Sequence, residues 1–311
     1  MSSPVPSDPV FADGVIVIDK PAGPTSHDVV AVMRRAVRGR KVGHTGTLDP
    51  LASGVLPLVI GKATRLARFL SSAEKEYEAH IELGVETTTL DRGGEAVTRH
   101  RMRTPSQLTN VMIDEAVAAF RGTYLQQPPA FSAKKIDGDR AYDLARRNVP
   151  VRLQPVQVTA TVLEVMEWVG TTLRLRLVCS VGYYVRSLAD ALGERLGTGA
   201  HLAGLVRTRS GDFTLADAVG LDVLDRRPAD AAARVVPLAA LLPSLPAITL
   251  TPEGASLAAR GGFIGASHVA GPSFPEGGRV RLLHPDGHLI AIAERRAGGV
   301  AGVLHPGVVL E

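Results

Sequence analysis

Apolar and polar residues alternate over several segments of this chain, and the alternation predicts β-strands. Residues 75–83 place apolar side chains on one face and acidic residues with a histidine on the other, as in a strand with one buried face. Residues 172–179 alternate in the same way, whereas residues 14–18 and 55–60 are continuously apolar and predict buried strands. A further strand is predicted over residues 156–168.

Apolar residues at helical spacing predict helices between these strands. One helix follows Thr25 or Ser26, either of which is a preferred N-terminal cap, and it ends at Gly39. Strands outnumber helices and do not alternate regularly with them. This pattern favours an α+β fold with a mixed, mostly antiparallel sheet flanked by helices. The other predicted helices are residues 107–121, 140–147 and 185–196.

Composition divides the chain into a large first part and a small last part. Residues 1–13, rich in serine and proline, are predicted to be a disordered lead-in, and residues 14–240 are predicted to form one large domain. An alanine-, proline- and leucine-rich stretch with little periodicity follows. Beyond it come short apolar segments, with a hairpin predicted around Asp286-Gly287. A small β-rich domain is therefore expected over residues 245–311.

Cysteine, histidine and apolar content limit the classes of protein to which this chain can belong. The single cysteine, Cys179, excludes an internal disulfide and a cysteine-based zinc site, and it favours a reducing compartment such as the cytoplasm. No apolar run approaches the roughly 20 residues that a membrane helix needs. His284 and His288 flank a tight turn without an evident third ligand, so no metal site is expected there.

Positive charge is concentrated in the first part of the chain. Residues 1–220 carry 27 Lys and Arg against 23 Asp and Glu, whereas residues 221–311 carry eight of each. Residues 34–41 hold five cations and no acid, and residues 130–152 hold six cations against three acids. Such patches suit a phosphate-bearing partner. Because arginine outnumbers lysine by 29 to 6, composition bias with solvated patches is an equally good interpretation.

The segment Gly43–Gly54 (GHTGTLDPLASG) combines turn-forming residues with an acid. Three glycines and a proline within twelve residues predict a fixed loop between apolar elements, where catalytic groups often lie. Asp49 is the only acid in this loop. The loop therefore lacks the second carboxylate that the paired-acid arrangement of a glycosidase requires. Taken alone, Asp49-Pro50 is slightly better explained as a turn initiator than as a catalytic site.

The same loop resembles the signature of the bacterial tRNA pseudouridine-55 synthases, and the resemblance continues along the chain. It covers roughly residues 14–220, with a weaker match of the tail to the RNA-binding PUA domain. Several motifs in the family's order are more specific than any single motif. The chain departs from the pattern where Tyr183 replaces a usual threonine, Val206 a usual arginine and Lys134 an apolar residue. The matching segments, besides the loop, are Gly14–Pro21, Lys75–Tyr77, Leu83–Gly94, Pro128–Lys135, Cys179–Arg186 and Leu205–Thr208.

The resemblance implies an enzyme that isomerises one uridine of tRNA to pseudouridine, without a cofactor or a metal. The N1–C1′ bond breaks, the base rotates, and C5 joins C1′. Asp49 matches the family's catalytic carboxylate, which either attacks or deprotonates the sugar–base unit. This acid is expected to be buried. Arg186 matches the cation that keeps it charged and oriented. The implied fold is that of the pseudouridine synthases, with an RNA-contacting insertion at 125–152 and a β-barrel-like PUA domain over 245–311.

The other site residues that the resemblance implies surround a uridine base flipped out of its RNA stack. Tyr77 matches the ring that stacks on the base, and Tyr184 matches a pocket tyrosine that takes the C5 proton or holds the base. His44 matches the residue that fills the space the base leaves. Lys20 either supports the loop of Asp49 or is a solvated lysine after a strand. The remaining implied substrate-binding residues are Asp91, which caps its own turn or contacts the RNA backbone, Leu205 and Lys135.

The expected partner is tRNA, contacted at its TΨC arm, and the chain is expected to act as a cytoplasmic monomer. Two functions of other classes stay open. One is a non-catalytic RNA-binding protein that keeps the fold, and the other is a carboxylate hydrolase of nucleosides or sugars. A synthase of the same fold that modifies another RNA position is the alternative that the sequence excludes least.

Overall fold

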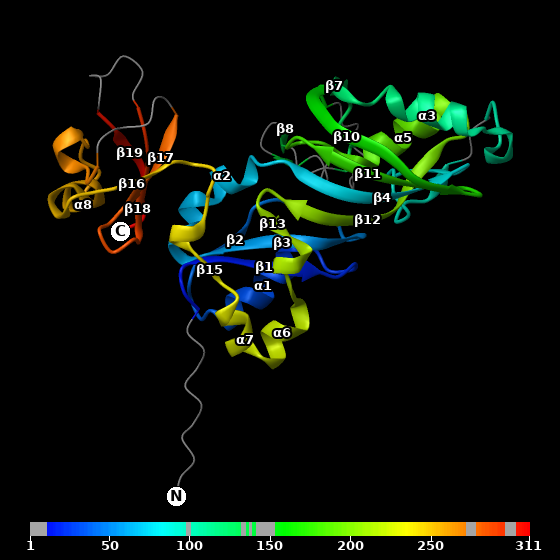
Figure 1. The fold of residues 1–311 in the computed structure, drawn as a ribbon. Helices are drawn as coiled ribbons and strands as arrows, with labels where there is room; N and C mark the ends of the chain where they lie inside the picture. The colour runs from blue at the N-terminus through cyan, green and yellow to red at the C-terminus, as the bar shows by residue number, and fades with distance from the viewer. Residues whose placement is uncertain are drawn as a thin grey trace, which may run out of the picture.

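Among the described residues, 11 strands form one mixed sheet at the centre of the molecule (Figure 1). Eight of them follow the order β14-β1-β3-β12-β4-β11-β10-β7, and β2, β13 and β15 pair beside this path. Their bounds are β1 Gly14–Lys20, β2 Val42–His44, β3 Ala52–Ile60, β4 Lys75–Leu83, β7 Gly122–Gln126, β10 Val156–Val169, β11 Thr172–Cys179, β12 Ala200–Ser210, β13 Phe213–Thr214, β14 Val219–Gly220 and β15 Val236–Pro237. Two small pairs accompany the sheet, β5 Glu86–Thr87 with β6 Ala96–Val97, and β8 Lys135–Ile136 with β9 Asp139–Arg140. The computed structural model describes residues 11–97, 101–131, 135–136 and 139–140 (backbone only for these four), 153–271, 278–295 and 303–311.

Most neighbouring strands run antiparallel, whereas β12 is parallel to β3 and β14 is parallel to β1. The predicted α+β fold with a mixed, mostly antiparallel sheet is therefore confirmed. The sequence pattern does not predict β12, although this strand lies between β3 and β4. Its pairing with β4 shifts register at Leu202/Gly204 and again at Arg207/Arg209. These bulges break the period-two alternation by which a strand is recognised.

Strand β1 is buried on both faces, which explains its continuous apolar sequence. Ile16 and Ile18 pack into one core cluster with Met33 of the helix that follows. Val15 and Val17, on the opposite face, belong to a second apolar cluster. Strand β4 alternates instead because its polar face carries ion pairs rather than a second core layer.

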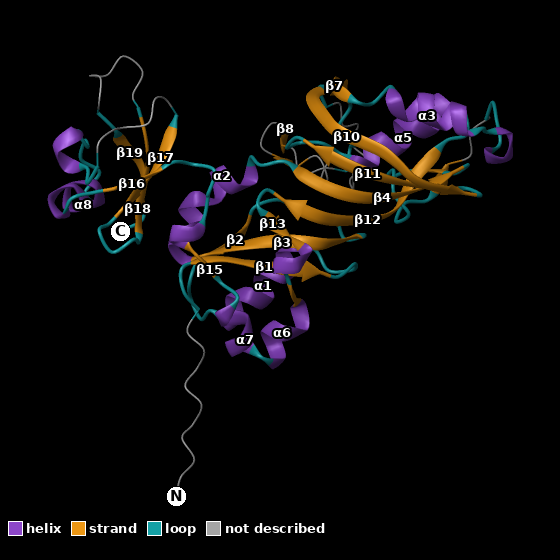
Figure 2. Ribbon diagram, viewed as in Figure 1, coloured by secondary structure: helices purple, strands orange, loops and turns teal. Residues whose placement is uncertain are grey.

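Helices cover the sheet near both of its ends (Figure 2). Helices α1, α6 and α7 lie near β1, whereas α3 and α5 pack against each other and against β10 and β12. Thr25 caps α1, and α5 ends at Gly197, whose φ of +73° is left-handed. No helix among the described residues has the length and apolar character needed to cross a membrane. The bounds are α1 Ser26–Ala36, α2 Ala67–Ser71, α3 Asn110–Ala118, α5 Val185–Leu196, α6 Leu221–Arg226, α7 Pro228–Ala233 and α8 Pro252–Ala259, with 3-10 turns at Gly61–Leu66, Pro105–Gln107, Leu215–Asp217, Leu238–Ala240 and Ala266–His268.

Several predicted boundaries differ from the structure. The helix expected over 107–121 is only α3, because a 3-10 turn precedes it and Gly122, at a φ of +78°, begins the unpredicted strand β7. Arg140 lies in strand β9, so the helix expected over 140–147 is wrong at its start, and residues 141–147 lie outside the described part. The loop expected over 43–54 is shorter, since β2 includes His44 and β3 begins at Ala52.

A second sheet of four strands forms within the described part of the last 65 or so residues. Its order is β16-β17-β18-β19, and β17 and β18 form the hairpin predicted around Asp286-Gly287. Leu289 and Ile292 of β18 belong to the same apolar cluster as Val15 of the first sheet. The two sheets therefore share apolar packing. The bounds are β16 Ala247–Thr249, β17 Arg279–Leu283, β18 Leu289–Glu294 and β19 His305–Val309.

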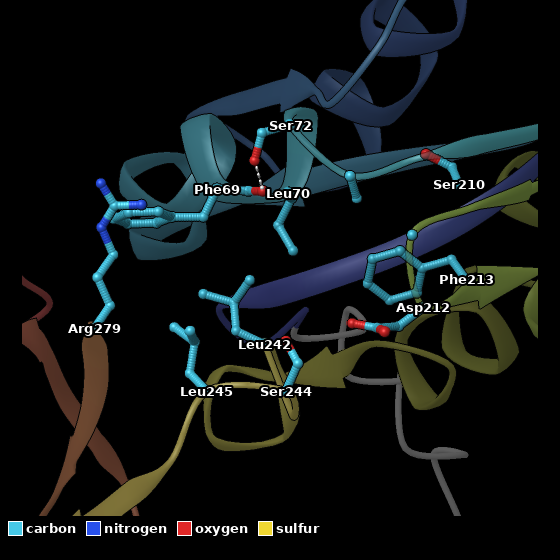
Figure 3. Close-up of a pocket in the computed structure, with 12 residues that line it drawn as sticks. Phe69, Leu70, Ser72, Ser210, Asp212, Phe213, Leu242, Ser244, Leu245 and Arg279 are labelled. Atoms are coloured by element: carbon cyan, nitrogen blue, oxygen red, sulfur yellow. Dashed lines mark hydrogen bonds between the residues drawn. The ribbon is translucent and has the colours of Figure 1, made fainter. Parts of the chain in front are cut away.

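A cavity of about 270 Å³ lies at the junction of the two sheets (Figure 3). Phe69 of α2, Phe213 of β13, Leu242 and Arg279 of β17 line it. The Arg279 guanidinium lies over the Phe69 ring, 5.2 Å from its centroid. None of the predicted site residues lines this cavity, so the candidate site lies elsewhere.

Candidate active site

The loop that carries Asp49 is held by hydrogen bonds from other segments. The hydroxyl of Ser26, at the start of α1, donates to the Leu48 carbonyl at 3.0 Å and accepts from the Leu48 amide at 2.9 Å. The Gly23 amide donates to the Pro50 carbonyl at 2.8 Å. Both residues that flank Asp49 are therefore fixed to the segment that leads into α1.

Arg207 of β12 supports the same loop from the central sheet. Its side chain is buried, and its Nε donates to the Val55 carbonyl at 2.7 Å. Its two Nη atoms donate to the carbonyls of Gly46 at 3.1 Å and Thr47 at 3.4 Å. A buried cation is tolerated only where such bonds compensate for lost hydration. The sequence reasoning did not select Arg207 as a site residue, although it lies in a motif shared with the family. The signal available in the sequence was an arginine that directly follows an apolar segment.

Arg186, the second residue of α5, brings its guanidinium to the Asp49 carboxylate. Its Nε lies 2.9 Å from Oδ2, and its Nη2 donates to Oδ1 at 3.3 Å. Two parallel contacts of this kind fix orientation as well as charge. The predicted pairing of these two side chains is confirmed. The predicted burial of the acid is wrong, because the Asp49 side chain is 36% exposed and it is Arg186, at 8%, that is buried.

A second carboxylate, that of Asp91, also approaches Arg186. Asp91 Oδ2 lies 3.8 Å from Arg186 Nε, while Oδ1 accepts from the Thr89 hydroxyl at 2.7 Å and from the Gly93 amide at 2.9 Å. Asp91 thus caps its own turn, as one of the two sequence hypotheses predicts. The loop sequence gives Asp49 no acidic neighbour, but folding places both acids on one guanidinium. The shared cation offsets the repulsion between them.

Gln126, the last residue of β7, holds the start of α5 and is a site residue that the sequence reasoning missed. Its amide Nε2 donates to the Tyr184 carbonyl at 3.0 Å, and its Oε1 accepts from the Tyr184 amide at 2.8 Å. Tyr184 is the cap of α5, two residues before Arg186. The hydroxyl of Tyr183 is 2.8 Å from that of Tyr124, and burial raises the pKa of Tyr183.

The chain that follows β7 is tied to the same helix start. The Ser187 hydroxyl donates to the Gln127 carbonyl at 2.7 Å, and Arg186 Nη2 donates to the Phe131 carbonyl at 2.9 Å. Residues 126–131 lie at the start of segment 125–152, for which an RNA-contacting insertion is predicted. Arg186 is therefore bonded both to Asp49 and to the entrance of that segment.

Tyr77 and Leu205 lie on adjacent strands of the sheet beside this loop. The β4–β12 register pairs Tyr77 with Arg207 and Leu205 with Ala79. Because residues two apart share a face, Tyr77, Leu205 and Arg207 lie on the same face of the sheet. Burial raises the pKa of the Tyr77 hydroxyl, and the nearby Arg207 guanidinium opposes that rise. The structure thus brings both predicted substrate-binding residues next to the side chain that supports the Asp49 loop.

Lys20 is fully buried at the end of β1, so the alternative of a solvated lysine is wrong. Its Nζ donates to the carbonyls of Pro21 and Pro24, each at 2.8 Å. Burial lowers the pKa of Lys20 to about 8, and the nearby Asp49 carboxylate works in the opposite direction. Lys20 therefore fixes the turn between β1 and α1, whose Gly23 amide bonds to the Asp49 loop.

His44 and Lys135 complete the predicted residues. His44 Nδ1 accepts from the Gly46 amide at 3.3 Å, and its ring meets that of His27 edge to face, with centroids 5.8 Å apart. Burial lowers the pKa of His44. His44 thus lies at the base of the Asp49 loop. The side chain of Lys135 lies outside the described part of the structure.

Two family models match adjacent parts of this chain. The model described as TruB family pseudouridylate synthase (N terminal domain) matches residues 34–185, and the tRNA pseudouridylate synthase B C-terminal domain matches residues 186–243. The chain belongs to the TruB family of pseudouridylate synthases. The first TruB match contains Asp49 and Asp91, and the second begins at Arg186.

Relatives that align with nearly the whole chain agree with the TruB assignment. A tRNA pseudouridine synthase B of Solibacter usitatus (strain Ellin6076) is 44% identical, over 96% of this chain and 100% of that protein. Another from Geobacillus thermodenitrificans (strain NG80-2) is 39% identical, over 94% and 95%. Among solved structures, a Cbf5-Nop10-Gar1 complex contains a chain that matches with a TM-score of 0.72 at 25% identity, over 100% of this chain and 92% of that one. The fold is that of the pseudouridine synthases.

Proposed function

We propose that this TruB-family chain isomerises uridine to pseudouridine at position 55, in the TΨC loop of tRNA. Relatives named tRNA pseudouridine synthase B align with nearly the whole chain at 39–44% identity. The observation that carries the proposal is the Asp49 carboxylate, partly open to solvent and held by Arg186 at 2.9 Å. An oriented anion on a loop that is bonded on both sides suits a reaction at the sugar–base bond of a nucleotide.

The reaction keeps every atom and electron of the uridine. The N1–C1′ bond breaks and the C5–C1′ bond forms, while C5 loses a proton and N1 gains one. The reaction therefore needs no redox or group-transfer cofactor. Asp49 attacks or deprotonates the sugar–base unit, and the paired contact with Arg186 orients its carboxylate toward that unit. The Asp91 carboxylate lies 3.8 Å from the same Arg186 Nε and adds a second negative charge beside it.

The reacting base must first leave its RNA stack, because a uridine inside a folded loop does not expose these atoms. In this proposal Tyr77 stacks on the flipped base, which stabilises it by about 1–3 kcal/mol. Tyr184 takes the C5 proton or holds the base, Leu205 packs beside it, and His44 fills the vacated space. The register that places Tyr77 and Leu205 on one face, beside the Asp49 loop, supports this assignment.

The RNA is proposed to contact two further parts of the chain. One is the insertion at 125–152, whose cations, Lys135 among them, meet phosphates. The other is the C-terminal region over 245–311, as a PUA-like domain, which the separate sheet β16–β19 supports.

To test the second contact, exposed Arg260 of the full chain is changed to glutamate, and the affinity for tRNA is measured as a function of salt concentration. A shallower salt dependence is expected, and an unchanged slope contradicts this contact. The proposed enzyme is a monomer of the cytoplasm.

The central test compares Asp49→Asn with Asp225→Asn, a matched change at an exposed aspartate of α6. Each protein is mixed with unmodified tRNA, and pseudouridine is mapped by mass spectrometry. We expect product at position 55 with the control and none with Asp49→Asn. Appreciable product from Asp49→Asn contradicts the proposed role of the carboxylate. Product at another position supports the alternative RNA target, and a released free base supports the hydrolase alternative.

A further inference from the structure

The short segment between strand β11 and helix α5 leads to Arg186 and is held by neighbouring strands. At its first end, the Ser180 amide donates to a carbonyl of β10 at 2.9 Å, and the Ser180 hydroxyl accepts from a β10 amide at 3.0 Å. Residues 181–182 are exposed. The place at which α5 starts therefore depends on the contacts of the next two residues, Tyr183 and Tyr184.

Strand β7 contacts both of these tyrosines. Tyr124 and Gln126 are two residues apart in β7, so their side chains lie on the same face of the sheet. The Gln126 side chain bonds to the amide and the carbonyl of Tyr184. The Tyr124 hydroxyl lies 2.8 Å from the Tyr183 hydroxyl. One strand thus holds two successive residues, one through its backbone and the other through its side chain.

A further hydrogen bond joins these two contacts into a closed ring. The Gln126 amide nitrogen carries two hydrogens. It donates to the Tyr184 carbonyl at 3.0 Å and to the Tyr124 hydroxyl oxygen at 3.3 Å. The ring runs from Tyr183 through Tyr124 to Gln126, and the backbone of Tyr184 closes it. Because the members share partners, the loss of one bond loosens the others.

The surroundings of the two hydroxyls favour a lasting bond between them. Burial raises the pKa of both Tyr124 and Tyr183, so both side chains stay protonated at neutral pH. Their rings meet edge to face with centroids 6.2 Å apart, and Phe120 meets the Tyr124 ring in the same way at 5.6 Å. Tyr183 also packs against the main apolar core. The rings are therefore held by packing, and the hydroxyls meet where little water competes.

We propose that Tyr124 and Tyr183 are positioning residues for the isomerisation, which hold the start of α5 so that Arg186 meets the catalytic carboxylate. This inference rests on the proposed function and adds two side chains outside the reacting centre. Arg186 follows Tyr183 by three residues, less than one helical turn, so a backbone shift at Tyr183 reaches the guanidinium. Its contacts with Asp49, at 2.9 Å and 3.3 Å, leave little room for such a shift.

The test removes one hydroxyl at a time from the full chain and keeps both rings. In steady-state pseudouridine formation, we expect Tyr124→Phe and Tyr183→Phe each to lower kcat at least about fivefold. KM for tRNA should stay within about twofold. The double variant should be about as slow as either single variant, because the two hydroxyls make one bond. Thr123→Val is the matched control, since it removes the bond to the Thr159 hydroxyl on the exposed face of β7 and keeps the wild-type kcat.

Failure of this inference differs from failure of the proposed function. A wild-type kcat in both single variants overturns the inference, because the tyrosine pair then stabilises the fold without positioning α5. If the wild-type protein itself forms no pseudouridine, the proposed function fails, and the position of Arg186 is judged by NMR without RNA. We expect the Arg186 Nε–H to exchange with solvent at least about fivefold faster in Tyr124→Phe than in Thr123→Val. Equal exchange rates in these two variants overturn the inference.

Discussion

Replacement of Gln126 by methionine tests whether the start of α5 is positioned by a side chain outside the reacting centre. Gln126 is 4% exposed, and its amide satisfies both the carbonyl and the amide of Tyr184. Methionine has a similar length, but it cannot form these two hydrogen bonds, and it leaves no space for a water molecule that could replace them. Each backbone group left buried without a partner costs about 1–3 kcal/mol. The two groups together therefore cost about 2–6 kcal/mol if the chain does not rearrange.

The chain can relieve this cost by moving Tyr184, and that motion carries Arg186 with it. Because Arg186 Nε lies only 2.9 Å from Asp49 Oδ2, a small shift breaks the paired contact. We expect kcat to fall at least about tenfold, which corresponds to about 1.4 kcal/mol of barrier. KM for tRNA should change less than about threefold, because Gln126 faces the protein interior. The free energy of unfolding should fall as well. The size of this fall is the cost of the unpaired Tyr184 backbone groups that remains after Tyr184 has moved.

The assay combines steady-state pseudouridine formation with urea unfolding. Gln126→Glu keeps the acceptor for the Tyr184 amide but loses the donor, so an intermediate loss of kcat is expected. Gln127→Met is the matched control, since that neighbouring side chain is exposed and bonds to the Leu153 carbonyl instead. A Gln126→Met protein with reduced stability but wild-type kcat would refute the reasoning, because Gln126 would then stabilise the fold without positioning Arg186.

Three further predictions follow from the contacts of the site and its supporting elements. Arg207→Lys loses the bonds to the Gly46 and Thr47 carbonyls, so single-turnover pseudouridine formation should slow by at least about tenfold; a wild-type rate contradicts this. Because burial lowers the pKa of Lys20 to about 8, its charge is lost as pH rises through 8, and kcat should fall over that range. Persistence of this alkaline decline in Lys20→Met would assign it to another group. Gly197→Ala places a side chain at a φ of +73°, and urea unfolding should show a loss of about 1–3 kcal/mol.

Patterns within single elements were predictable from the sequence because local spacing determines them. The strict alternation of residues 75–83 predicts β4 with its bounds, and the apolar spacing over 185–196 predicts α5, with Gly197 as its stop. Strand β12 could not be found in this way, because its two bulges reverse the alternation within one strand. The pattern also does not show β7, a short edge strand in which Leu125 is exposed.

The site was predictable only in part, for a different physical reason. Motif resemblance selected Asp49 and Arg186, and the structure places them in contact. It did not select Gln126 or Arg207, whose side chains bond to backbone carbonyls and amides far away in sequence. Backbone groups are present at every residue, so no side-chain motif marks the partner. Such supporting residues become visible only when the fold has brought the two segments together.

The distribution of burial between Asp49 and Arg186 explains how one site can be both rigid and open. A buried cation requires several acceptors, and Arg186 has them in the carboxylates of Asp49 and Asp91 and in the carbonyls of Thr89 and Phe131. These acceptors come from three segments of the chain, so the guanidinium is fixed in space. Asp49 needs only this one partner to be oriented, and its carboxylate stays accessible to substrate. If Asp49 is neutralised, Arg186 keeps its other three acceptors, and the loop keeps its bonds to Ser26 and Arg207. Loss of turnover in Asp49→Asn therefore reports on chemistry rather than on collapse of the site.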